Sequence, residues 1–224
     1  MELPADVTLH ENFVTEEEAR KLAEFCMQDG IYDDGEKEDY NQAYFGMSSG
    51  GRRPFIYRSK WPIHDIFWRM CERISQLEEL GGYFPNMIMI NRYKPGKGVP
   101  MHLDLKTKGF IAAVLTVQGK PCVMNFAKEK HLGDEHPDHL HALVKSRSLM
   151  VLKKLGLHCY QHGIDDHEPE PGEPVRISIQ FRVGDMRMYN KKDDTGEWSF
   201  PVEFVRGFVS AERYAELKSK EPNK

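Results

Sequence analysis

The chain has 224 residues, of which 40% are hydrophobic and 29% are charged, a balance typical of one globular domain and too apolar for a disordered chain. The formal net charge of −4 excludes a protein that coats nucleic acid through a broadly basic surface, although it allows a local basic rim. No apolar run approaches the roughly 20 residues that cross a bilayer, and the first residues lack the pattern of a signal peptide. We therefore expect no membrane partner and an intracellular location, cytoplasmic and/or nuclear.

Two helices are predicted in the first third of the chain. Thr15 and Glu18 form a capping box, in which each side chain satisfies a backbone N–H at the start of a helix. Apolar residues then recur at helical spacing, and Gly30 predicts the end of this helix. A second helix is predicted over Pro62–Leu80, followed by Gly81 as its stop. We expect the apolar stripes of both helices to pack on the core.

The stretch between these helices, residues 31–57, is rich in Gly, Asp and Tyr and has little periodicity. Long loops in compact domains are typically lids or binding loops. We therefore predict a substrate lid within residues 30–60.

Beyond the second helix, short apolar segments separated by Gly and Pro turns predict β-strands. The predicted strands are Met87–Tyr93, Phe110–Thr116, Cys122–Phe126, Ser148–Leu152 and Val175–Val183. Together with the helices, they predict an α+β fold that is mainly β and is built as a sandwich or barrel.

The last of these strands alternates strictly between apolar and polar residues. Its polar face carries Arg176, Ser178, Gln180 and Arg182. One interpretation is the solvent-facing side of an edge strand, and the pattern alone favours it. The other is a pair of arginines that bind one anionic ligand, because a guanidinium can hold a carboxylate with two parallel hydrogen bonds. A metal motif nearby would favour the second interpretation.

Such a motif begins with His102 and Asp104, which form an H-x-D sequence. In an extended segment these side chains point the same way and can reach one metal ion. A histidine from a later strand would complete a set of two histidines and one carboxylate, which suits Fe(II) with open coordination positions. His158 and His162 both follow an apolar strand and are the candidates. His162 is favoured because Gly163 lets the backbone turn closely beside a metal.

Further histidines lie in the charged stretch K-E-K-H-L-G-D-E-H-P-D-H-L-H. We interpret this stretch as a solvated loop rather than a second metal site. The histidines concerned are His131, His136, His139 and His141.

Four motifs in this order and at similar separations are typical of the AlkB family. They are N-x-Y-x-x-G at Asn91–Gly96, H-x-D at His102–Asp104, H-G-I at His162–Ile164 and R-x-x-x-x-x-R at Arg176–Arg182. Each motif alone is weak, but the ordered set with predicted strands between its members is specific. The chain therefore resembles the AlkB family over about residues 86–183.

This resemblance implies a double-stranded β-helix, or jelly-roll, core with the N-terminal helices packed on its outside. It implies an AlkB-like domain at residues 1–184 and a C-terminal extension of unknown role at residues 185–224. It also implies an oxidoreductase, a dioxygenase that uses Fe(II), 2-oxoglutarate and O2 and releases succinate and CO2. The implied iron ligands, which are also the catalytic residues, are His102, Asp104 and His162. The implied cosubstrate contacts are Asn91, Tyr93, Arg176, Ser178 and Arg182.

Two positions depart from the pattern of AlkB-like enzymes that repair alkylated bases. Lys106 stands two residues after the H-x-D motif, where those enzymes carry an acidic residue near the base. Ser178 stands where they usually carry asparagine, and serine there resembles relatives whose substrates include RNA or are poorly defined. Repair of alkylated DNA is thus less strongly implied than the chemistry.

The segment Gly51–Lys60 interleaves positive charges with aromatic rings. Cations can pair with phosphates while rings stack on a single-stranded or flipped base, and an ordinary surface loop is the equal alternative. The candidate substrate contacts are Tyr44, Arg52, Arg53, Tyr57, Arg58 and Lys106.

The favoured hypothesis is an oxidative demethylase or hydroxylase that acts on an alkylated or modified base in DNA or RNA. The first alternative is the same chemistry on a protein side chain or a small molecule. The second is a non-catalytic jelly-roll binding module, against which the intact metal and arginine motifs argue.

Overall fold

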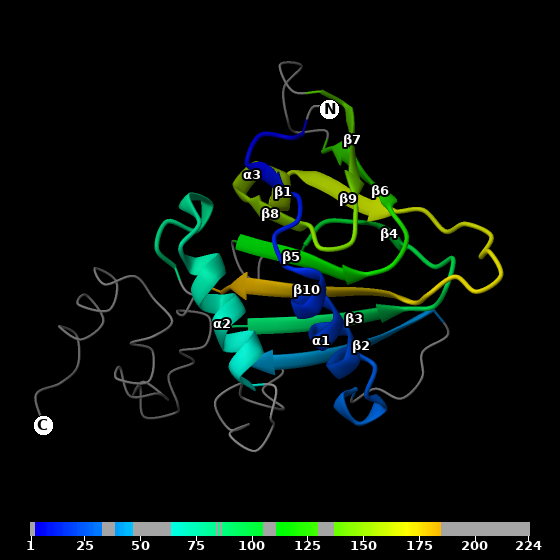
Figure 1. Cartoon of the computed structure of the whole chain (residues 1–224). Coiled ribbons are helices and arrows are strands. Elements are labelled where there is room, and N and C mark those ends of the chain that lie inside the picture. Colours follow the sequence, from blue (N-terminus) through cyan, green and yellow to red (C-terminus); the bar gives the residue numbers. More distant parts are fainter. Residues whose placement is uncertain are drawn as a thin grey trace, which may run out of the picture.

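The computed structural model describes residues 3–32, 39–46, 64–83, 85, 87–104, 111–129 and 137–184. These residues form two antiparallel β-sheets that face each other, and two helices lie across the outer face of the larger sheet (Figure 1). The predicted jelly-roll core with external N-terminal helices is confirmed. None of the helices in the described ranges is long and apolar enough to cross a membrane.

The larger sheet has six strands and the smaller sheet has four. In spatial order, the larger sheet contains β1 (Val7–His10), β8 (Leu149–Lys153), β5 (Ile111–Gln118), β10 (Arg176–Val183), β3 (Met87–Tyr93) and β2 (Tyr40–Gly46). The smaller sheet contains β4 (Val99–His102), β9 (Tyr160–Ile164), β6 (Cys122–Lys128) and β7 (His139–Val144). A short helix, α3 (Lys154–His158), connects β8 to β9.

Helix α1 (Glu16–Cys26) begins where the sequence predicted. Thr15 is its N-cap, with both hydrogen bonds of the capping box present. The helix ends at Cys26, earlier than predicted, and a 3-10 helix at Asp29–Ile31 follows before the chain continues.

Helix α2 (His64–Ser75) is shorter than the single helix predicted over Pro62–Leu80. The extended backbone of Leu77, at ψ 138°, interrupts the helical hydrogen bonds, and a separate 3-10 helix follows it at Glu78–Leu80. Gly81 then has a left-handed backbone at φ 56°, which glycine adopts without steric cost, so the predicted stop is confirmed. The first predicted residues, Pro62 and Ile63, lie outside the described residues.

The two faces of β10 are both inside the protein. Ile177, Ile179 and Phe181 are fully buried against the helices, where the Phe181 ring lies 6.5 Å from that of Phe67 on α2. The opposite, polar face looks toward the smaller sheet and lines the cavity described below. Because β10 is paired with β5 on one side and β3 on the other, its interpretation as a solvent-facing edge strand is wrong.

Several strands were absent from the sequence prediction. β2 lies in the stretch that was predicted as a loop, where few apolar residues signal a strand, and its pairing with the long strand β3 provides its stability. β7 lies in the histidine-rich stretch that was predicted as a solvated loop. Its residues alternate between exposed and buried, so His139 and His141 face solvent while Leu140 packs in the core. His131 and His136 lie outside the described residues.

Candidate metal and cosubstrate site

A cavity of about 310 Å³ lies between the two sheets. Its floor is the inward face of the larger sheet, and the smaller sheet contributes two histidines. The polar side chains that line it are Tyr40, Gln42, Asn91, Tyr93, His102, Asp104, Thr116, His162, Arg176, Ser178, Gln180 and Arg182. All eight predicted metal-ligand and cosubstrate residues therefore line the same cavity.

His102, Asp104 and His162 form a compact group at one wall of this cavity. His102 ends β4 and stands directly opposite His162 in the register of β4 and β9, so backbone pairing brings the two rings to 4.7 Å between centroids. The Asp104 carboxylate lies 3.9 Å from Nε2 of His102 and 3.8 Å from Nε2 of His162. One ligand atom from each residue lies within 4.8 Å of the other two. The arrangement can hold a metal ion from one side and leave positions open on the other.

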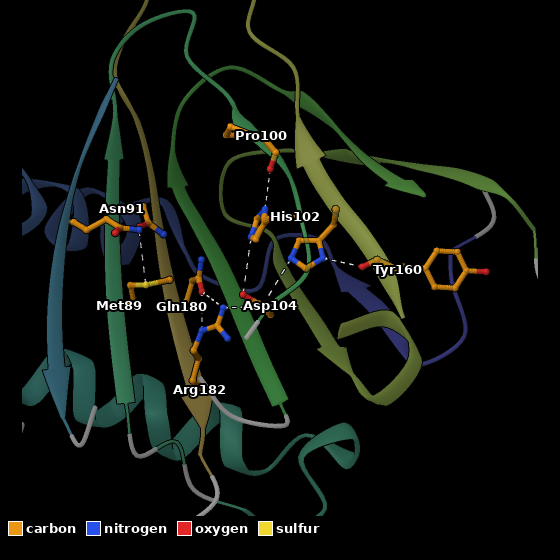
Figure 2. A network of polar contacts seen from close by, with 10 residues as sticks. Met89, Asn91, Pro100, His102, Asp104, Tyr160, Gln180 and Arg182 are labelled. Carbon is orange, nitrogen blue, oxygen red and sulfur yellow. Dashed lines mark hydrogen bonds and ion pairs between the residues drawn. The ribbon is translucent and has the colours of Figure 1, made fainter. Parts of the chain in front are cut away.

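Hydrogen bonds to backbone carbonyl groups orient both imidazole rings for metal binding, as the contact between His102 and Pro100 in Figure 2 shows. Nδ1 of His102 lies 2.8 Å from the carbonyl oxygen of Pro100, and Nδ1 of His162 lies 3.3 Å from that of Tyr160. A carbonyl oxygen only accepts, so Nδ1 must carry the proton in each ring. Nε2 is then left as the metal-binding atom, as is usual when a backbone carbonyl supports a ligating histidine.

The protonation states also suit a metal. Burial opposes ionisation of Asp104, but the Arg182 guanidinium outweighs it and holds the pKa of Asp104 below its usual value. Burial lowers the pKa of His162, despite the opposing charge of Asp104, and this favours the neutral imidazole. Metal ligands must be deprotonated in this way. His102 has a side chain that is 42% exposed, so the open side of the group faces outward there.

The larger sheet presents buried hydrogen-bond donors to the same cavity. Nη2 of Arg176 and Nδ2 of Asn91 are buried and have no hydrogen-bond partner among the described residues. A buried donor without a partner costs about 1–3 kcal/mol, which a ligand with several acceptor oxygens would relieve. The donor set therefore fits a dicarboxylate such as 2-oxoglutarate.

Tyr93 lies beside these donors in the cavity. The Arg176 guanidinium carbon lies 3.7 Å from the centre of the Tyr93 ring, and the two residues are register partners on β10 and β3. Burial raises the pKa of the Tyr93 phenol although Arg176 opposes the shift, so the hydroxyl stays protonated and can donate a hydrogen bond. Ser178 is also buried, at 3% exposure, beside these residues.

Arg182 lines the cavity but is held by protein groups. It donates a hydrogen bond of 2.8 Å to Asp104 and another, also of 2.8 Å, to the side-chain oxygen of Gln180. Arg182 and Asp104 are both almost fully buried. The larger sheet thereby positions the carboxylate of the metal group, as the bond from Arg182 to Asp104 in Figure 2 shows.

Two motif glycines are explained by close backbone contacts. Gly96 has a φ of 75°, and a Cβ there would lie 2.4 Å from the carbonyl oxygen of His167. Its N–H donates to Glu173, which ties the connection after β3 to the segment before β10. A Cβ on Gly163 would lie 2.8 Å from the carbonyl oxygen of Val99, so only glycine lets β9 pass β4 beside His162.

The other predicted site residues are placed as follows. His158 ends α3 and is not part of the group of ligand atoms, so the structure brings His162 and not His158 to Asp104. The backbone of Tyr44 is on β2 opposite Met89. Its side chain lies outside the described residues, as do Arg52, Arg53, Tyr57, Arg58 and Lys106.

Sequence reasoning missed the contributions of Tyr40, Gln42 and Thr116 to the cavity. Thr116 lies on a strand that was predicted, and as the one polar residue between Ile111 and Val117 it could have indicated a polar cavity behind this strand. Tyr40 and Gln42 gave no such signal, because β2 has no regular apolar pattern.

The profile of the 2OG-Fe(II) oxygenase superfamily matches residues 6–182, and the chain belongs to this superfamily. The match confirms the fold that the sequence implied. Proteins of this superfamily use Fe(II), 2-oxoglutarate and O2, so the match confirms the metal and cosubstrates that the sequence implied. The group of His102, Asp104 and His162 fits this metal.

Known proteins agree with an AlkB-like chain. The mouse (Mus musculus) protein tRNA (carboxymethyluridine(34)-5-O)-methyltransferase ALKBH8 is 26% identical over 198 residues, which are 81% of this chain and 27% of the mouse protein. The zebrafish (Danio rerio) protein "Probable RNA/DNA demethylase ALKBH6" is 30% identical over 109 residues, which are 46% of each chain. This chain thus spans less than half of either relative. The structure of OsALKBH1 shares the fold, with a TM-score of 0.51 at 15% identity over 81% of this chain and 100% of that one.

Proposed function

We propose that this protein is an Fe(II)- and 2-oxoglutarate-dependent dioxygenase in which His102, Asp104 and His162 bind the iron. The observation that carries this proposal is the convergence of three ligand atoms at the wall of a cavity that also contains buried donors without a hydrogen-bond partner among the described residues. Two histidines and one carboxylate are the ligand set of non-haem iron oxygenases.

We further propose that 2-oxoglutarate binds against the larger sheet. Arg176 would hold one carboxylate, supported by the hydroxyl of Tyr93, while Asn91 and Ser178 would donate to the remaining oxygens. A guanidinium with a free Nη2 is suited to a two-pronged contact with a carboxylate. The other end of the cosubstrate would then lie next to the metal group, near Arg182, which contacts Asp104.

The bound iron, 2-oxoglutarate and O2 would supply the oxidising chemistry, which hydroxylates a C–H bond of the substrate and yields succinate and CO2. The residues of this chain bind and orient the reactants. Arg182 and Gln180 keep the Asp104 carboxylate in place, and the carbonyl groups of Pro100 and Tyr160 hold the two imidazoles. Burial of Asp104 and His162 keeps water away from their side of the site.

The proposed substrate is a modified or alkylated base in RNA or DNA, from which an N-methyl group would leave as formaldehyde after hydroxylation. Two observations support a nucleic acid. Both curated relatives above are named for one, the mouse protein for tRNA and the zebrafish protein for RNA or DNA. The sequence also carries the basic and aromatic segment Gly51–Lys60, which would contact the substrate from the proposed lid.

The proposal is tested by succinate release from purified protein with Fe(II) and 2-oxoglutarate. Methylated RNA, methylated DNA and methylated peptides are compared as substrates, each against its unmethylated form. We expect succinate release to rise with a methylated nucleic acid and to disappear in His162→Ala. His141→Ala is the matched control, because this histidine is exposed on β7, outside the metal group.

The outcomes separate the alternatives. Stimulation by methylated peptides alone would replace the nucleic-acid substrate by a protein. An absence of succinate with every substrate and without substrate would contradict a dioxygenase and favour a binding module.

A further inference from the structure

We infer that Gln42 is a positioning residue that holds the Asn91 amide in the orientation needed to donate a hydrogen bond to 2-oxoglutarate. This inference rests on the proposed function, because it requires the cosubstrate to bind beside Asn91. Gln42 belongs to β2, the edge strand of the larger sheet that the sequence did not predict.

The contact between the two amides is direct. Gln42 and Asn91 are register partners on β2 and β3, and Nε2 of Gln42 donates a hydrogen bond of 2.7 Å to Oδ1 of Asn91. The Asn91 side chain is 1% exposed and lines the cavity, and its Nδ2 has no hydrogen-bond partner among the described residues. The Asn91 side-chain oxygen thus accepts from Gln42, and its Nδ2 is left to donate into the cavity.

The orientation matters because the two ends of an asparagine amide have nearly the same shape and opposite hydrogen-bonding character. A carboxylate only accepts hydrogen bonds. If the Asn91 amide turned over, its oxygen would face the anion and the contact would become repulsive. A donor fixed on Oδ1 prevents this rotation, as a supporting partner fixes the tautomer of a ligating histidine.

The surroundings of Asn91 favour this role over simple packing. Gln42, Asn91, Ser178 and Thr116 are consecutive register partners across β2, β3, β10 and β5, and form one polar row. Three of them are almost fully buried, at 1% for Asn91 and 3% for Ser178 and Thr116. Arg176 precedes Ser178 on the same face of β10. Because Asn91 is the register partner of Ser178, it lies on the strand next to that of Arg176, two residues away in register from this proposed carboxylate-binding arginine.

The first test measures 2-oxoglutarate binding by calorimetry to protein loaded with Mn(II), a redox-silent substitute for Fe(II). Gln42→Leu removes the donor, and we expect the Kd to rise about fivefold to tenfold, since one buried hydrogen bond contributes about 1 kcal/mol. Gln42→Glu replaces the donor by an acceptor, which would draw Nδ2 toward itself and turn Oδ1 to the anion. We expect a larger rise, of about 100-fold, since a charged group is involved.

If Gln42 positions Asn91, its variants should lose affinity for 2-oxoglutarate and keep their other binding properties, whereas a misfolded variant would lose both. Mn(II) affinity should be unchanged in Gln42→Leu, because this variant adds no charge and both histidines of the metal group lie on the other sheet. In the iron-loaded enzyme the KM for 2-oxoglutarate should rise while kcat changes little. Gln76→Glu is the matched control, because it makes the same substitution at an exposed position after α2.

A double-mutant cycle separates positioning from direct contact. If Gln42 acts through Asn91, the double variant Gln42→Leu with Asn91→Ala should bind 2-oxoglutarate as Asn91→Ala does. Additive losses, or wild-type affinity in both Gln42 variants, would overturn the inference while leaving the proposed function intact. If wild-type protein fails to bind 2-oxoglutarate at all, the proposed function fails and the inference falls with it.

Discussion

The two walls of the cavity are built in different ways. The metal wall uses two strands of the smaller sheet, where the pairing of β4 with β9 sets His102 opposite His162. The anion wall uses four strands of the larger sheet, whose alternate residues form polar rows facing the cavity. The buried pair of Arg182 and Asp104 connects the two walls.

This difference has consequences for function. The metal wall has three ligand atoms, and the loss of any one leaves too few to hold an ion of this class. The anion wall divides the same task among a guanidinium, an amide and hydroxyl groups, so the loss of one donor weakens binding without abolishing it. We therefore expect all-or-none effects at one wall and graded effects at the other.

The largest effect is expected at the metal wall. His162→Ala, and likewise His102→Ala or Asp104→Ala, should abolish stoichiometric Fe(II) binding and succinate production while the circular dichroism spectrum stays native. The apolar core is untouched by these substitutions, because the three side chains belong to the cavity. Full activity in His162→Ala would contradict its assignment as a ligand and return His158 as the candidate.

The next effect is expected at Arg176. Arg176→Ala should raise the Kd for 2-oxoglutarate at least about 100-fold, because leaving a buried charge without its partner costs about 3–5 kcal/mol. Arg20→Ala on the exposed face of α1 is the control and should bind normally. Equal affinities in the two variants would remove Arg176 from the cosubstrate site.

Arg182→Met tests the connection between the walls. At pH 7 the free energy of unfolding of the metal-free protein should fall by about 3–5 kcal/mol, because Asp104 is left as an unpaired buried carboxylate. Added Mn(II) should restore part of this loss, since a cation can replace the guanidinium charge. Urea denaturation with and without the metal measures both effects, and a loss that is independent of the metal would contradict the connection.

The pH dependence of the Arg182→Met effect follows from the pKa of Asp104. In the wild type this pKa is lowered by folding, so its stabilising contribution is present above the ordinary value of about 4 and is lost as the pH falls below it. In Arg182→Met the pKa of Asp104 should be raised by burial, because the guanidinium is gone. Protonation of Asp104 at lower pH then removes the cost of burying an unpaired carboxylate. The difference in stability between the two proteins should therefore narrow from pH 7 to pH 4.

A smaller effect is expected for the segment Gly51–Lys60, which lies outside the described residues. Replacing Arg52, Arg53 and Arg58 together by alanine should weaken oligonucleotide binding and lower the slope of log Kd against log salt by up to about 3, because each phosphate contact releases close to one counterion. Decarboxylation of 2-oxoglutarate without substrate should survive, because the three arginines are not among the residues proposed to bind iron or 2-oxoglutarate. Salt-independent oligonucleotide binding by the wild type would contradict phosphate contacts.

The sequence predicted the two walls unequally, for physical reasons. The metal wall depends on residue types at fixed short spacing, so His102, Asp104 and His162 could be found from their motifs before any fold was known. The strands β3 and β10 were also predictable, because their apolar residues occupy one or both faces of a buried sheet.

The missing parts are those in which tertiary pairing overrides local pattern. β2 has a polar sequence and is a strand because β3 provides its hydrogen-bond partners, so Gln42 could not be placed in the cavity from sequence alone. The pairing of Arg182 with Asp104 was also missed, because the two residues are far apart in the chain and only the facing of the two sheets brings them together.

We propose that 2-oxoglutarate contacts both the metal wall and the anion wall, and thermodynamic linkage between metal and cosubstrate binding tests this most directly. A 2-oxo acid can chelate a metal through its keto and carboxylate oxygens, whereas glutarate has both carboxylates and lacks the keto group. If the two walls form one site, saturating Mn(II) should tighten the binding of 2-oxoglutarate by about tenfold or more and change that of glutarate much less. Equal affinities for 2-oxoglutarate with and without Mn(II) would contradict a shared site.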